Sequence, residues 1–173
     1  IEVFNGYNAT SSGGKGSTTE RGGNADGFAL KYGIHNYTLI DAHGQHNSDD
    51  GFDFWKAGNN ARIENDEVSI RVFYSSANLN GKNPLSENGD GNGFKFGSKD
   101  KYQRPKKDKG ARLIYGSVAC KNRMRGFDRN GTKMTITAEN IEARGNPKNN
   151  KQDVFSKSSK DEFALRCSQF PKK

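Results

Sequence analysis

Hydrophobic residues are scarce in this chain. They make up 31% of its 173 residues, and the mean hydropathy is −1.01. No apolar run is long enough to span a bilayer, so we expect no membrane partner. Such a composition approaches that of disordered chains, but the aromatic residues (10%) recur in similar local contexts and the 21 glycines are scattered between short apolar runs. The sequence therefore favours one polar domain with many tight turns and a thin core.

Cysteine is equally rare. Neither Cys120 nor Cys167 belongs to a Cys-x-x-Cys pair or to a Cys/His spacing typical of zinc sites. The two residues can form one disulfide that ties the C-terminal region to the body of the protein, or they can remain separate thiols. Asn8, Asn36 and Asn130 each begin an N-glycosylation sequence, which agrees with our expectation of a secreted, extracellular protein.

Positive charge is in excess. The formal net charge is +8 and the isoelectric point is about 9.5, which attracts polyanions such as nucleic acid, anionic lipid or acidic polysaccharide. Half of the lysines cluster in segments 99–109 and 148–160, where loop-forming residues indicate a solvated surface. The chain has no base-stacking motif and no basic helix, so binding of nucleic acid would depend on charge alone, and we expect no nucleic-acid partner.

The secondary-structure signals indicate strands. Helical periodicity is scarce, and the short apolar runs are rich in β-branched and aromatic residues and are bounded by Gly, Asn or Asp. These runs predict strands at Tyr37–Ile40, Ala61–Ile63, Val68–Phe73, Ala111–Val118 and Met134–Ile141.

A Gly-Phe pair recurs in related frames along the chain. The four phenylalanines of these frames are Phe28, Phe52, Phe94 and Phe127, and the first two are 24 positions apart, which suits one coil of a solenoid. The longer later spacings fit one coil plus loop insertions, at Ala77–Asn88 and Lys99–Lys109. Because equivalent residues of successive coils stack about 4.8 Å apart, the phenylalanines are predicted to form an internal aromatic column.

These repeats favour a parallel solenoid over an antiparallel β-sandwich, which would need hairpins at regular spacing. We expect a β-helix domain over residues 1–153, followed by a C-terminal tail or cap over 154–173, and a monomer. The chain opens on Ile-Glu-Val-Phe, which is typical of a strand already under way. We therefore expect a fragment or a processed product that lacks N-terminal coils.

Carboxylates concentrate next to the first two Gly-Phe frames. If successive coils align, Asp26, Asp49, Asp50 and Asp53 lie on two adjacent coils and repel one another unless a cation or protons neutralise them. Ca²⁺ accepts many oxygen ligands in loose geometry, and the Asn24 amide can complete the shell; Mg²⁺ prefers fewer carboxylates. The alternative is that these aspartates are turn formers, and strand alternation places Asp50 and Asp53 on one face only if a turn or bulge lies at Gly51.

In sequence order, the motifs Asn24–Lys31, Asn47–Asp53, Gly89–Gly97 and, more weakly, Arg125–Asn130 resemble the polysaccharide lyase family 9 pectate lyases, over roughly residues 1–153. The resemblance implies a right-handed parallel β-helix and a calcium site. It also implies that the carboxylate ligands are Asp26, Asp49, Asp50 and Asp53, with Asn24 nearby, and that Lys95 is the catalytic base.

The resemblance implies calcium-dependent β-elimination on pectate, polygalacturonate or a related acidic polysaccharide. A neutral lysine can remove the C5 proton of a uronate whose carboxylate is neutralised, and positive charge near Lys95 would lower its pKa as the reaction requires. Lys31, Arg125 and Arg129 are candidates for holding substrate carboxylates. The alternative function is a truncated or degenerate β-helix that binds acidic glycans without cleaving them.

Overall fold

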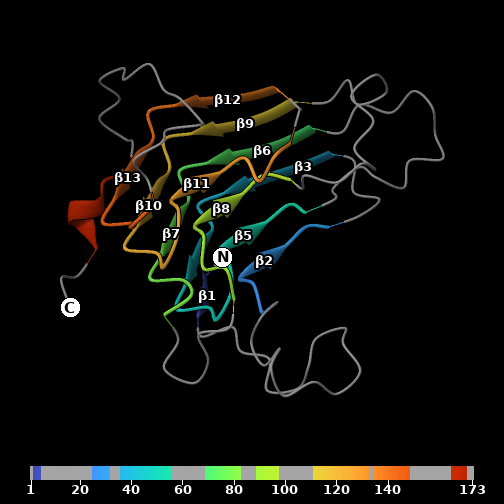
Figure 1. The fold of residues 1–173 in the computed structure, drawn as a ribbon. Helices are drawn as coiled ribbons and strands as arrows, with labels where there is room; N and C mark the ends of the chain where they lie inside the picture. The colour runs from blue at the N-terminus through green and yellow to red at the C-terminus, as the bar shows by residue number, and fades with distance from the viewer. Residues whose placement is uncertain are drawn as a thin grey trace, which may run out of the picture.

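A computed structural model of the chain describes residues 2–4, 25–31, 36–55, 69–82, 89–97, 111–132, 135–148 and 165–170. Throughout these residues the strands pair in parallel with equivalent strands of the preceding and following coils. The strands form three sheets that run side by side along the molecule (Figure 1). The polypeptide visits the three sheets in the same order in each coil, so the fold is the predicted parallel β-helix.

Each sheet collects one strand from every coil. The first sheet contains β1 (Glu2–Phe4), β4 (His43–Gln45), β7 (Ser76–Asn78), β10 (Val118–Cys120) and β13 (Glu142–Arg144). The second sheet contains β2 (Phe28–Ala29), β5 (Phe52–Asp53), β8 (Phe94–Lys95) and β11 (Phe127–Asp128). The third sheet contains β3 (Asn36–Ile40), β6 (Ser69–Phe73), β9 (Ala111–Tyr115) and β12 (Thr135–Glu139).

The second sheet carries the predicted aromatic column. Phe28, Phe52, Phe94 and Phe127 are register partners in β2, β5, β8 and β11. Successive ring centroids lie 4.7, 4.4 and 5.1 Å apart, with interplanar angles of 10°, 10° and 7°. The predicted column is confirmed, and it fixes the register of the residues on either side of each phenylalanine.

The core is thin and is shared between coils. Ile70, Val72 and Ile114 of the third sheet point inward and pack in one cluster with Phe52 and Phe94 of the second. Burying a side chain of this size contributes roughly 1.5–3 kcal/mol. Since each coil buries its apolar face only against its neighbours, the register of adjacent coils and the stability of the core depend on each other.

Tight corners join the third sheet to the first. One residue with positive φ follows each strand of the third sheet: Asp41 (52°), Tyr74 (48°), Gly116 (62°) and Asn140 (52°). The amides of Asp41, Tyr74 and Gly116 continue the ladder, since they donate to the next coil's Phe73, Tyr115 and Glu139 carbonyls. Because of this corner, the segment Ala111–Val118, predicted as one strand, belongs to two strands. Strand β9 ends at Tyr115, the chain turns at Gly116, and β10 begins at Val118.

A ladder of buried asparagines runs along the corner after the first sheet. Its members, which we call the asparagine ladder, are Asn47, Asn80, Asn122 and Asn146. Each side-chain oxygen from Asn80 onward accepts from both the backbone amide and the side-chain amide of the preceding member, at distances of 2.7–3.2 Å. The ladder satisfies polar groups that would otherwise be costly to bury, and it fixes the start of the segment that leads into the second sheet.

The predicted insertion Ala77–Asn88 was wrong in its first part. Ala77 and Asn78 belong to β7, where they are buried, and Asn80 belongs to the asparagine ladder. The extra residues instead lie between Gly81 and Gly91, whose backbones are in close contact. The insertion predicted at Lys99–Lys109 and the strand predicted at Ala61–Ile63 lie outside the described residues.

The two cysteines form a disulfide, Cys120–Cys167. It joins β10 to the short helix η2 (Cys167–Gln169), so the described part of the C-terminal region lies against the first sheet. The Leu165 amide donates to the Gly116 carbonyl at 3.0 Å, and the Cys167 amide donates to Glu142 Oε2 at 3.0 Å. The domain boundary predicted at residue 153 lies outside the described residues and stays a prediction. Among the described elements, no helix has the length and apolarity to cross a membrane.

Candidate metal centre and its lysines

The acidic residues lie on the turns that enter the second sheet. Asp26 precedes β2, and Asp49 and Asp50 precede β5 on the next coil. Asp50 precedes a bend at Gly51 and Asp53 lies in β5, so strand alternation does not separate them. The Lys95 ammonium lies 3.0 Å from Asp50 Oδ2 and 3.8 Å from Asp53 Oδ2.

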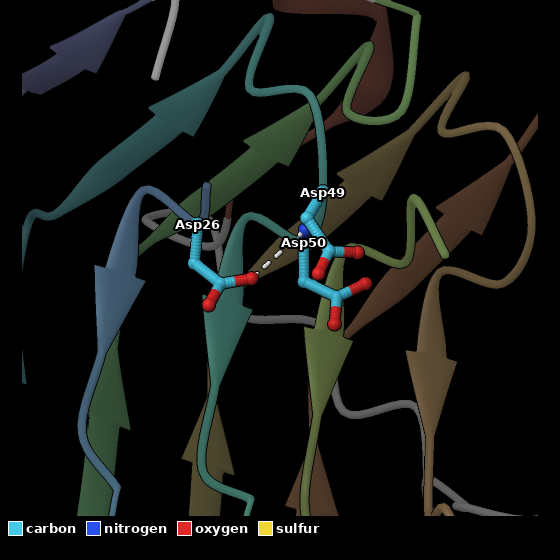
Figure 2. A group of neighbouring side chains, drawn as sticks. All are labelled: Asp26, Asp49 and Asp50. Carbon is cyan, nitrogen blue, oxygen red and sulfur yellow. Dashed lines mark hydrogen bonds between the residues drawn. The ribbon is translucent and has the colours of Figure 1, made fainter. Parts of the chain in front are cut away.

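Three carboxyl groups meet at this position. One oxygen each from Asp26, Asp49 and Asp50 lies within 4.8 Å of the others (Figure 2). The Asp26 and Asp50 side chains are 0% exposed, and Asp49 is buried. Residues of two adjacent coils therefore gather in one protected cluster, which we call the acidic cluster.

Hydrogen bonds between coils orient the acidic cluster. The Asp50 amide donates to Asp26 Oδ1 at 3.1 Å, the dashed contact in Figure 2. Asp50 Oδ1 in turn accepts from the backbone and side-chain amides of Asn92, at 2.6 and 3.0 Å. The other oxygen, Asp50 Oδ2, is buried without a hydrogen bond, and its 3.0 Å contact with Lys95 Nζ is an ion pair outside hydrogen-bond angles. The Lys95 ammonium is therefore the described partner of this buried oxygen, through an ion pair alone.

Burial and mutual repulsion make the acidic cluster costly to ionise. Burial and the Asp53 charge raise the pKa of Asp26 to about 6, although Lys31 opposes the rise. Burial and the Asp26 charge raise the pKa of Asp49 to about 7, against the effect of Lys95. Burial and then Asp49 raise the pKa of Asp50 well above its ordinary value. A cation that replaced water around these carboxylates would relieve the repulsion.

Asp53 lies beside the acidic cluster, between two lysines. Its Oδ2 atom is 2.8 Å from Lys31 Nζ and 3.8 Å from Lys95 Nζ, and its Oδ1 accepts from the Trp55 amide at 2.8 Å. Asp53 and Lys95 are register partners on β5 and β8, as the repeat alignment predicted. The structure thus places Asp53 close to the other predicted ligands, but with its side chain engaged by lysine.

Lys95 occupies the rim of the acidic cluster. Its ammonium lies 2.9 Å from Asp90 Oδ2, 3.0 Å from Asp50 Oδ2 and 3.8 Å from Asp53 Oδ2. Burial alone would lower the pKa of Lys95, but Asp50, Asp53 and the other nearby carboxylates outweigh it and raise this pKa above its ordinary value. Without a metal ion the lysine is therefore a protonated ammonium, and the lowered pKa that a base needs can arise only after those carboxylates are neutralised.

The predicted substrate-binding residues have different surroundings. Lys31 is not extended into solvent: its ammonium bridges Asp26 at 2.7 Å and Asp53 at 2.8 Å. Arg125 has a side chain that is 40% exposed, and it pairs with Asp128 at 3.2 Å on the coil after Lys95. Arg129 follows β11 and is partly exposed. The predicted ligand Asn24 lies outside the described residues.

Two residues at the site were missed by sequence reasoning. Asn92 supports the Asp50 carboxylate, and Asp90 contacts both Asp49 and Lys95. A signal for Asp90 was available: it precedes Lys95 by five residues, as Asp26 precedes Lys31 by five, and both pairs are bonded. The two Asp–Lys pairs repeat one arrangement on different coils.

The donor set fits a hard divalent cation. The acidic cluster offers carboxylate oxygens from three residues, one of them without a hydrogen bond, and Asp53 is within reach of the same lysine that contacts Asp50. Oxygen-only ligands that come from two turns with loose geometry suit Ca²⁺ better than a transition metal. The residues present therefore fit a calcium ion.

Comparisons with known proteins agree with this fold. The family model described as "Pel9A-like, right handed beta helix region" matches residues 4–161. The solved structure described as "Crystal structure of pectate lyase Pel9A" aligns with a TM-score of 0.58 and 27% identity over 79% of this chain. The chain spans 33% of the length of that protein. The comparison with curated proteins found no match. Because the family model covers most of the sequence, the chain belongs to the Pel9A-like right-handed β-helix family.

Proposed function

We propose that the chain forms the catalytic coils of a Ca²⁺-dependent polysaccharide lyase of the family 9 type, which cleaves pectate, polygalacturonate or a related acidic polysaccharide by β-elimination. The observation that carries the proposal is the acidic cluster, whose carboxylate oxygens lie within 4.8 Å of one another and whose Asp50 contacts Lys95 at 3.0 Å. The solved relative is described as a pectate lyase, which supports the same chemistry.

The residues divide into ligands and a base. Asp26, Asp49, Asp50 and Asp53 are the proposed ligands, and Asn24 is a further candidate beyond the described residues. A bound Ca²⁺ would neutralise the uronate carboxylate and so make its C5 proton more acidic. Lys95 lies on the coil that follows the ligands, at the edge of the same cluster. Lys95 is the proposed acceptor of the C5 proton, and its position beside Asp50 supports this role.

The proposed reaction leaves Lys95 as the proton acceptor. Neutral Lys95 takes the proton from C5, the electron pair of that bond becomes the C4–C5 double bond, and the C4–O4 bond breaks. The leaving oxygen then takes a proton from solvent, and an unsaturated sugar remains at the new chain end. Arg125 and Arg129, on the coil beyond Lys95, are the proposed contacts for neighbouring sugar carboxylates, and the net charge of +8 favours encounter with a polyanion.

A secreted location is part of the proposal. The Cys120–Cys167 disulfide supports it, since disulfides persist in oxidising compartments. An acidic polysaccharide outside the cell is the partner that the basic surface and the acidic cluster together favour.

An elimination assay tests the proposed function directly. The protein is incubated with polygalacturonate and Ca²⁺, and the ultraviolet absorbance of the unsaturated product is followed with time. We expect absorbance to rise with Ca²⁺ and to stop rising after chelation. A protein that binds the polymer in a pull-down but gives no absorbance would instead be a non-catalytic glycan-binding β-helix.

The pH dependence of stability tests the acidic cluster without substrate. The folded-state pKa values of Asp26 (about 6) and Asp49 (about 7) exceed the unfolded value of 3.8. The folded chain therefore binds more protons than the unfolded chain between these values, and its stability falls as the pH rises through this window. The pKa values of Lys31 and Lys95 are raised above the ordinary value of 10.5, so these side chains do not titrate between pH 5 and pH 7.5.

We expect the chelated protein to lose on the order of 3 kcal/mol of unfolding free energy between pH 5 and pH 7.5. Urea unfolding at the two pH values measures this difference, and added Ca²⁺ should remove most of it. Asp49→Asn provides the control, because without one titrating carboxyl the pH dependence should shrink. A chelated protein equally stable at both pH values would contradict the described electrostatics.

A further inference from the structure

The segment Gly89–Asp90 enters the site from an insertion. On two other coils four residues connect the asparagine ladder to the phenylalanine, between Asn47 and Phe52 and between Asn122 and Phe127. On the coil of β8 the connection leaves at Gly81 and returns at Gly91, and a Cβ built at Gly81 would lie 2.5 Å from Gly91 Cα. The two ends of the insertion, Gly81 and Gly91, therefore lie in contact, and Gly89 and Asp90 lie against the acidic cluster.

The backbone of this segment is packed directly on a proposed ligand. A Cβ added at Gly89 would collide with Asp49 Cα and with the Ser48 carbonyl oxygen, so no side chain fits at this position. The next amide, that of Asp90, donates to Asp49 Oδ1 at 2.6 Å. The segment is thus held against Asp49 by shape and by a hydrogen bond.

Arg123 of the following coil holds the segment from the other side. Its Nη1 donates to the Gly89 carbonyl at 3.2 Å, and its Cβ would lie 2.7 Å from a Cβ built at Gly91. The Arg123 amide donates to the Asn80 carbonyl at 2.9 Å, which fixes the start of the same insertion. Residues of three successive coils therefore fix the backbone that bears Asp90.

The Asp90 carboxylate differs from the other partners of Lys95. Two of the three carboxylates around the Lys95 ammonium, Asp50 and Asp53, are proposed metal ligands. Asp90, at 2.9 Å, is 61% exposed and is not part of the acidic cluster. When the ligands are engaged by a cation, Asp90 is the remaining described carboxylate that can hold the lysine in place.

We propose that Asp90, clamped by Arg123 through the Gly89 carbonyl, is a positioning residue that fixes the Lys95 side chain beside the metal centre. The inference rests on the proposed function, in which Lys95 is the base. Asp90 acts through a hydrogen-bond acceptor oxygen at a set position rather than through its charge or through metal ligation. Displacement of a catalytic base by about 1 Å lowers the rate of the reaction strongly. Loss of the contact with Asp90 should therefore lower turnover, because it lets Lys95 move.

Kinetics of three variants test the proposal. In Asp90→Ala we expect kcat to fall roughly 10- to 100-fold, with KM and the calorimetric Ca²⁺ affinity within about threefold of the unmodified chain. In Asp90→Asn most of kcat should return, because the amide oxygen still accepts from Lys95 without a charge. The matched control, Glu139→Ala, removes an exposed carboxylate at the end of β12 and should leave both parameters unchanged.

A double-mutant cycle tests the clamp. Arg123→Ala should lower kcat less than Asp90→Ala does, and the double variant should be no slower than Asp90→Ala alone, since both changes act through Asp90. Additive losses would show that Arg123 acts by another route. A loss of Ca²⁺ affinity in Asp90→Ala would make Asp90 a ligand, and an Asp90→Asn variant as slow as Asp90→Ala would make its charge the important property; either result overturns the proposal.

A readout that needs no turnover separates this inference from the proposed function. Nitrogen-15 NMR of the Lys95 side-chain nitrogen in the Ca²⁺-loaded protein reports how restricted the motion of this side chain is. We expect restriction in the unmodified chain and in Asp90→Asn, and its loss in Asp90→Ala. If the unmodified chain proves inactive as a lyase, the proposed function fails, but these spectra still decide whether Asp90 positions Lys95; unchanged spectra in Asp90→Ala would refute it.

Discussion

Lys95→Ala is expected to remove nearly all lyase activity while it leaves calcium binding intact. Loss of a general base lowers the rate by 10²- to 10⁴-fold in typical cases, and we expect a loss of roughly 10³-fold here. Calcium affinity should stay equal or rise, because the ammonium contacts Asp50 and Asp53 and so competes with a cation for their oxygens. Initial rates on polygalacturonate and calorimetric Ca²⁺ titration measure the two effects.

Two further variants make this test specific. Lys95→Arg keeps a cation near Asp50 and Asp90 but cannot lose its proton, so it should be as inactive as the alanine variant. Lys148→Ala removes an exposed lysine and serves as the charge-matched control, with activity unchanged. Substantial activity in Lys95→Ala would place the base elsewhere, and a loss of calcium binding there would mean that Lys95 chiefly maintains the acidic cluster.

Asp50→Ala is expected to weaken Ca²⁺ binding by roughly 100-fold or more, equivalent to about 3 kcal/mol. Asp50 is fully buried in the acidic cluster, one of its oxygens has no hydrogen bond, and Asn92 donates to the other. Its removal deletes a ligand and a charge at once, and it leaves the Asn92 amides without their acceptor. Titration of the chelated variant with Ca²⁺ in a calorimeter measures the change.

The conservative variant separates charge from shape at the same position. Asp50→Asn retains an oxygen that can accept from Asn92, so its loss of affinity should be smaller than that of Asp50→Ala but still at least about tenfold. Asp41→Asn, which alters an exposed carboxylate that contacts His43 instead of the acidic cluster, is the control. An unchanged titration for Asp50→Ala would refute its assignment as a ligand.

Much of the coil register could be predicted because aromatic residues report it in sequence. Each Gly-Phe frame marks the same point of a coil, and the residue after each phenylalanine pairs with its equivalents, so Asp53 and Lys95 were correctly placed side by side. The clustering of Asp26, Asp49 and Asp50 followed from the same alignment. Periodic features of this kind are visible in one sequence because the fold repeats them.

The features that could not be predicted depend on contacts between different coils at irregular positions. The asparagine ladder was hidden because asparagine is common in this chain and its members are unevenly spaced, from Asn47 to Asn146. The start of the insertion was misplaced because nothing in the residues around Ala77 separates a short strand from a loop. The ion pair of Lys31 with Asp53 was not predicted, since Asp53 becomes its neighbour only when the coils stack. The role of Lys31 as a substrate contact stays a prediction.

The distribution of the site over successive coils has a consequence for its behaviour under partial unfolding. Contacts in a solenoid are made between neighbours, so the coils that bear β8 and β11 can open while the coils that bear Asp26, Asp49 and Asp50 stay folded. Such local opening would release Lys95 and the arginines of the following coil before the acidic cluster is lost. Mild heat or denaturant should therefore abolish turnover before it abolishes cation binding.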